Sequence, residues 1–202
     1  MSKFPLEPNS QMIATLGKPT GFPLLHAMLF AVSAADAVVA AIAAIIAAFA
    51  TSAEETVVTT GFTDPAVPRN ITATAGGTAA DVAAVQVIIV GTDYVGEVIT
   101  ETLPAFTLNT AGSVAGAKAF ATITSVTVPA MDGVGATVSI GFGDILGLPS
   151  LLTENTVIAA YLDGVIESTA PTVAMDAANI SGNTIDLNSA LDGTLVNVLL
   201  FI

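Results

Sequence analysis

The chain has 202 residues, of which 53% are hydrophobic and only 10% are charged, well below the roughly 25% that is usual in soluble domains. So few charges indicate a surface that is covered by partners or by other copies of the chain. The net charge of −13 disfavours nucleic acid and anionic lipid as partners. With no Cys and one His, the chain has no disulfide, no thiolate or multi-histidine metal site and no cysteine nucleophile.

Residues 1–23 are predicted to form an extended N-terminal arm. The segment contains four prolines and two glycines, and proline both fixes φ and removes a hydrogen-bond donor. Scattered apolar side chains could anchor such an arm on another surface. They are Phe4, Leu6, Met12, Ile13, Leu16 and Phe22.

Residues 24–50 are predicted to form one long apolar α-helix. The stretch has no Pro, no Gly and one charged residue, Asp36, and a helix that is apolar all round is a buried helix. Its length would also suit a membrane span. Against a span stand the central carboxylate, the high Ala content and the absence of flanking basic or aromatic residues. A secretory signal is a third reading, but the apolar run is too long for one and its leader carries little positive charge.

Large side chains in this predicted helix, with Ala35 at the one remaining position, follow alternating spacings of three and four, which is typical of a heptad seam. We expect the seam to serve oligomerisation or attachment to a partner. Its members are Leu25, Met28, Val32, Val39, Ile42, Ile46 and Phe49.

Residues 51–202 are predicted to form an acidic β domain, with fifteen acidic residues against Arg69 and Lys118. Short runs rich in Val, Ile and Thr, separated by Gly, Pro and Asp, indicate a β-sandwich or a small barrel. A boundary between two β lobes could fall between residues 149 and 171. The expected strands span residues 56–60, 69–75, 84–91, 97–103, 121–128, 136–143, 156–162, 165–168, 184–187 and 194–202.

No motif indicates catalysis, so we expect no enzymatic activity and no cofactor. Gly141-Phe142-Gly143 lacks the third glycine of a dinucleotide-binding loop and is predicted to be a turn. Four loop acids could gather around a cation, although their spacing fits no calcium loop and solvated turns are favoured. They are Asp64, Asp93, Asp132 and Asp144. Glu97 and Glu101 could share a strand face as paired carboxylates, with nothing else to support glycoside chemistry.

Four stretches of the β region carry a resemblance: residues 63–70, 91–97, 117–120 and 141–149. Together they resemble virion proteins of tailed bacteriophages, of the capsid decoration or cement kind. The resemblance covers residues 60–202 and excludes the arm and the predicted helix. It implies a structural role on the outer capsid surface, binding to the major capsid protein, and a homo-oligomer, most often a trimer.

The sequence therefore predicts a cement protein that stabilises a capsid lattice without catalysis, contacting neither nucleic acid nor membrane. In this reading the arm and helix attach the protein, and the acidic domain lies outside the shell. One alternative is another virion component of the neck, tail or head fibre. A second is a surface β adhesin that is anchored in a membrane through residues 24–50.

Overall fold

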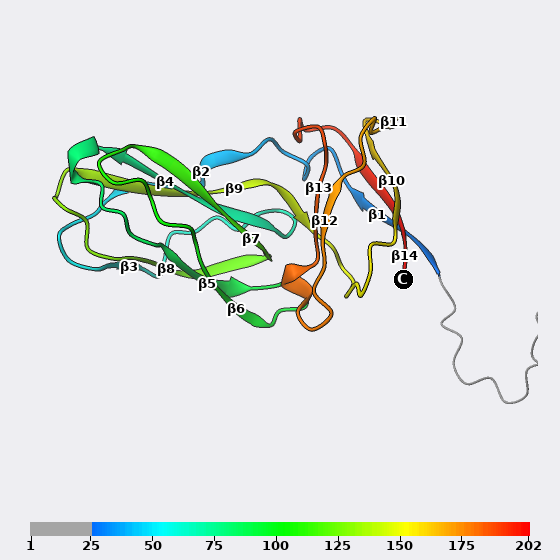
Figure 1. Ribbon diagram of the computed structural model, residues 1–202, viewed down its shortest axis with the longest axis horizontal. Coiled ribbons are helices and arrows are strands. Elements are labelled where there is room, and N and C mark those ends of the chain that lie inside the picture. Colours follow the sequence, from blue (N-terminus) through cyan, green and yellow to red (C-terminus); the bar gives the residue numbers. More distant parts are fainter. Residues whose placement is uncertain (1–25) are drawn as a thin grey trace, which may run out of the picture.

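The computed structural model describes residues 26–202, and within that range the protein is mainly β, as predicted. The predicted arm over residues 1–23 lies outside the described residues. Figure 1 shows an elongated molecule, with one lobe built mainly from residues 41–147 and a smaller lobe that contains both residues 27–32 and residues 196–201.

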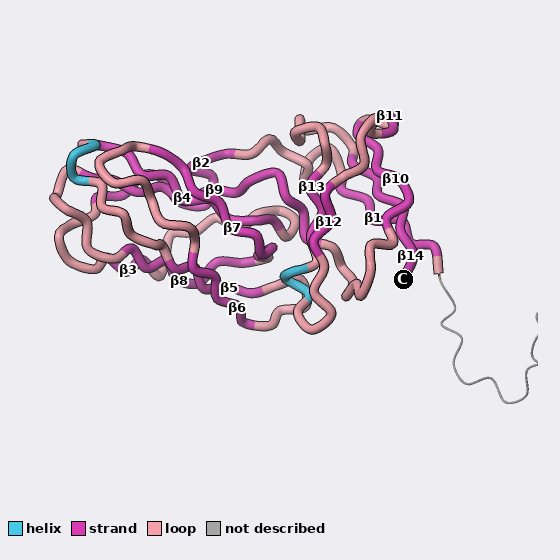
Figure 2. Tube along the Cα trace, viewed as in Figure 1, coloured by secondary structure: helices cyan, strands magenta, loops and turns pink. Residues whose placement is uncertain are grey.

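The described strands form three sheets, which we call A, B and C. Sheets B and C face each other in the larger lobe (Figure 2). Their inward side chains form the first hydrophobic core, which includes Ile71, Ile89, Phe120 and Ile140. Sheet C has the order β3 (Thr56–Val58), β8 (Thr122–Val128), β5 (Ile88–Thr92) and β6 (Val98–Thr102). Sheet B has the order β12 (Thr172–Ala174), β13 (Thr184–Asp186), β9 (Ala136–Gly147), β4 (Arg69–Gly77) and β7 (Gly112–Phe120), and β2 (Ala41–Ala50) also pairs with β9.

Sheet A forms the outer layer of the smaller lobe and packs over a second core that includes Phe30, Leu146, Ile185 and Val198. Its strand order is β1 (Ala27–Val32), β14 (Val196–Phe201), β10 (Val157–Leu162) and β11 (Val165–Ile166). The C-terminal strand is central in this sheet. A two-residue turn with positive φ at Asp163 and Gly164 joins β10 to β11. Short 3-10 helices cover Ala79–Asp81 and Ile180–Gly182.

The long apolar helix predicted over residues 24–50 was wrong. The structure forms β1 and β2 there, joined by a turn and a short loop. In that turn the backbone N–H groups of Asp36 and Ala37 donate to the Ser33 carbonyl, and Ser33 Oγ donates to Asp36 Oδ2 at 2.6 Å. The charge assigned to the middle of a helix therefore belongs to a turn between two strands.

Tertiary pairing explains why strands replace the helix. Alanine favours helices by less than about 1 kcal/mol per residue, a preference that context readily overrides. β1 pairs antiparallel with β14 along its whole length, and β2 pairs with β9 through two register shifts. Those shifts break up the two-residue alternation in β2, so the local sequence did not reveal it.

Three smaller expectations also differ from the structure. β7 and β12 were not predicted, and β7 is rich in Gly and Ala rather than in β-branched residues. The predicted turn at Gly141-Phe142-Gly143 lies inside β9. A Cβ on Gly141 would overlap the carbonyl oxygen of Ala41 in β2, and one on Gly143 would press on the side chain of Asn70. Both glycines therefore allow close packing beside β9.

Arg69 is buried where the two lobes meet, with 1% of its surface exposed. Its guanidinium donates to the Val38 carbonyl at 2.7 Å and to Asp144 Oδ1 at 3.3 Å, and it lies 4.4 Å from the centre of the Phe142 ring. Burial lowers the pKa of Arg69 to about 10, and the Asp144 carboxylate opposes that shift. The cation thus joins the β1–β2 connection to β4 and β9.

Replacing Gly141 with Ala should lower the free energy of unfolding by about 2 kcal/mol or more, because β2 must move away from β9. Urea denaturation measures the change. Gly112→Ala is the matched control, since a Cβ there meets nothing within 4 Å in the described structure. Equal stability of the two variants would contradict the close approach.

Asp144→Asn should lower the free energy of unfolding by about 1–3 kcal/mol, because it leaves the Arg69 cation buried without a counter-charge. The double variant Arg69→Met/Asp144→Asn should recover part of the loss, which urea denaturation of all three proteins would show. A single variant as stable as the parent would mean that the ion pair contributes nothing.

Candidate functional site

The structure separates the seven residues that were predicted to form a helical seam. Leu25 lies outside the described residues. Val32 is buried in the second core, and Met28 packs against that core. The other four do not share one surface. Val39 and Ile42 are 57% and 58% exposed, whereas Ile46 and Phe49 pack against the first core.

Sheet A presents an uncharged outer face. None of the residues in its four strands is charged. Phe30, Val32, Val196, Val198 and Leu200 point inward to the second core, so alternation places their strand neighbours on the other side. We call that side the outer face of sheet A, and its larger members are Leu29, Ile158, Tyr161, Ile166, Leu199 and Phe201.

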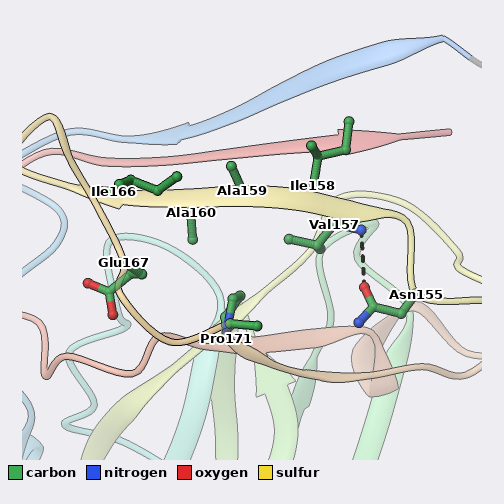
Figure 3. Close-up of a pocket in the computed structure, with 9 residues that line it drawn as sticks. Asn155, Val157, Ile158, Ala159, Ala160, Ile166, Glu167 and Pro171 are labelled. Carbon is green, nitrogen blue, oxygen red and sulfur yellow. Dashed lines mark hydrogen bonds between the residues drawn. The ribbon is translucent and has the colours of Figure 1, made fainter.

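The outer face exposes large apolar side chains. Leu29, Ile158 and Ile166 are 61%, 53% and 57% exposed. Figure 3 shows Ile158 and Ile166 on the opposite side of the sheet from Val157 and Ala160. Interface cores are depleted of charged residues in the same way. This face therefore has the composition of a surface that contacts another protein.

A small hollow of about 210 Å³ lies between β10 and residues 166–171 (Figure 3). Each of its two polar side chains already accepts one hydrogen bond: Asn155 Oδ1 accepts from the Val157 N–H at 3.0 Å, and Glu167 Oε2 accepts from the Ser189 N–H at 2.9 Å. Val157, Ala160 and Pro171 supply apolar walls. The hollow brings no nucleophile together with a base.

Several of the acids considered as cation ligands or as a carboxylate pair are bound to the protein itself. Asp64 accepts from the Ile123 N–H, Asp93 from the Val95 and Glu97 N–H groups, and Asp144 pairs with Arg69. Glu101 Oε1 accepts from two backbone N–H groups of β7. Residues 26–202 contain no group of three potential metal ligands. The structure does not bring these carboxylates to one site.

Helices of membrane-spanning length and hydropathy do not occur among residues 26–202.

Ionisation of Asp186 destabilises the folded chain. Partial burial, and then the nearby Asp144 carboxylate, raise the pKa of Asp186 above its ordinary value of 3.8. The ionised form is therefore less favourable in the folded chain than in the unfolded chain. The resulting destabilisation is present above the raised pKa and disappears as the pH falls below 3.8.

Asp186→Asn should raise the free energy of unfolding at pH 7 by less than about 1 kcal/mol, since solvent screens part of the penalty. The gain should vanish as the pH falls below 3.8, where the parent carboxyl is also neutral. Thermal unfolding across pH 3–8 measures it. Glu154→Gln, on an exposed loop, is the control, and a gain that is independent of pH would contradict the electrostatic cause.

A scan against models of protein families, a search of curated proteins and a search of solved structures each found no match.

Proposed function

We propose that this chain is a structural, non-catalytic protein that binds a protein lattice through the outer face of sheet A. The observation that carries the proposal is the exposure of Leu29, Ile158 and Ile166 on four strands that contain no charge. An exposed apolar sheet face in a chain with a net charge of −13 is costly to leave in water. It favours a permanent partner.

The lattice that we propose is the outer surface of a tailed-phage capsid, where the chain would act as a decoration or cement protein. The resemblance of residues 60–202 to such proteins supports this choice. The charge distribution also supports it, because an acidic body is repelled by packaged DNA and is best placed outside the shell. The major capsid protein is the proposed partner, and the proposed homo-oligomer is a trimer.

A neck, tail or head-fibre component is the second candidate. Its attachment would use the same uncharged face, so copy number separates the two. Stoichiometry of the chain in purified particles should match the number of capsid lattice sites for a cement protein. A few copies at one vertex would favour the neck or tail.

The membrane-anchored adhesin loses the anchor on which it depended. That alternative used residues 24–50 as a helix, and the structure forms β1 and β2 there.

The double variant Ile158→Asp/Ile166→Asp should bind capsids that lack this protein at least ten-fold more weakly than the parent, a loss of about 1.4 kcal/mol. Two carboxylates would then be buried at the contact. Co-sedimentation with capsids measures binding, and the thermal unfolding midpoint should stay unchanged, because both positions are exposed.

Val98→Asp/Val134→Asp is the matched control. These residues are 75% and 78% exposed and lie in the larger lobe, so this variant should bind like the parent. If the sheet A variant binds with parental affinity, the outer face is not the attachment surface. If the control weakens binding equally, added negative charge alone explains the loss.

A further inference from the structure

Among residues 26–202, one backbone edge of β1 has no partner strand. His26 exchanges both backbone hydrogen bonds with Ile202, so the alternate residues Met28, Phe30 and Val32 direct their backbone groups to β14. The N–H and C=O groups of Leu29 and Ala31 therefore point the other way. β1 ends the strand order of sheet A, and no residue from His26 to Ile202 pairs with this edge.

A groove of about 480 Å³ runs beside the same edge. One wall is residues 29–32 of β1, and the other walls include residues 66–68, Tyr94 and Pro149. Residues from both faces of β1 line it, which places the groove along the edge rather than on one face. None of its lining residues is charged. The groove thus offers apolar walls and free backbone groups to one extended strand.

We propose that the groove is filled by residues Asn9–Leu16 of the same chain, which add a strand to the edge of β1. This goes beyond the proposed function, because it assigns a different surface to a different occupant. A strand that pairs with β1 needs backbone N–H groups, which proline lacks. The longest run without proline before His26 is Asn9–Lys18.

Composition and charge favour this segment. Asn9–Leu16 contains Met12, Ile13 and Leu16 and no charged residue, so it suits uncharged apolar walls. Residues 1–25 hold two lysines and one glutamate, whereas residues 26–202 hold sixteen acidic residues against two basic ones. The N-terminal segment is therefore attracted to the body, while an acidic strand would be repelled.

The length of the connection allows the segment to return to its own β1. Nine residues separate Leu16 from His26, and an extended chain of that length reaches roughly 30 Å. β1 itself spans about 20 Å at the rise of a β-strand. A short tether also gives an effective concentration in the millimolar range, which favours pairing within one chain over pairing between copies.

Disulfide trapping in the full chain tests the proposal, because the chain has no native Cys. Ala31→Cys is combined in turn with a cysteine at Gln11, Met12, Ile13 or Ala14. Neighbouring strands bring opposed Cα atoms within disulfide range, and side chains alternate between faces. We expect a disulfide within one chain at alternate positions of this series, read by non-reducing electrophoresis and mass spectrometry.

The control series pairs the same four cysteines with Val134→Cys, an exposed position in the larger lobe. Cross-linking to position 31 should be at least ten-fold faster than to position 134. Equal rates would overturn the proposal. Cross-linked dimers in place of monomers would overturn pairing within one chain and indicate exchange between copies.

Hydrogen exchange gives a second test without cysteines. In the parent, the amides of Leu29 and Ala31 should exchange at least about 100-fold more slowly than in Ile13→Asp, which places a carboxylate in the groove. Ile13→Val should keep the parental protection. If these two amides exchange equally fast in the parent and in Ile13→Asp, Asn9–Leu16 does not cover the edge.

Discussion

The pairing of β9 along both of its edges is the constraint on which the rest of the structure depends. One edge is taken by β4 over most of its length. The other edge is shared, first by β2 opposite residues 137–142 and then by β13 opposite residues 146–147. Val138 and Ile140 contribute to the first core, whereas Leu146 belongs to the second. β9 therefore contributes to both hydrophobic cores and fixes the position of one lobe relative to the other.

Arg69 fixes the same junction by a different interaction. An arginine cation inside a protein is tolerated only where polar groups surround it. Here those groups come from two separate stretches, since Val38 precedes β2 and Asp144 lies in β9, and both contact Arg69 at the start of β4. The pair also explains why one of the four basic residues of the chain is buried rather than used to balance the acidic surface.

Most of the β structure could be predicted from the sequence, because Val-, Ile- and Thr-rich runs such as Thr122–Val128 carry a local signal. Residues 24–50 could not, because their Ala content favours a helix locally and only the partners β14 and β9 make strands of them. In β1 the exposed residues Leu29 and Ala31 are apolar, as are the buried residues Phe30 and Val32, so no polar–apolar alternation marked the strand. The turn-forming Ser33 and Asp36 were the signal that was missed.

The outer face of sheet A could not be predicted from local sequence either. Leu29, Ile158 and Ile166 lie far apart in the chain, and no spacing rule connects them. They share a surface because β1 and β10 flank β14, and β11 follows β10.

A sheet with no charged residue in any of its strands has little to prevent association, because charged side chains on edge strands are a common defence. In sheet A the outer face and the β1 edge are separate surfaces at nearly a right angle to each other, since side chains project from a sheet and backbone hydrogen bonds lie within it. A strand added to the edge would extend the apolar face rather than hide it. Covering the edge would then prevent uncontrolled strand pairing and still leave the face available to a partner.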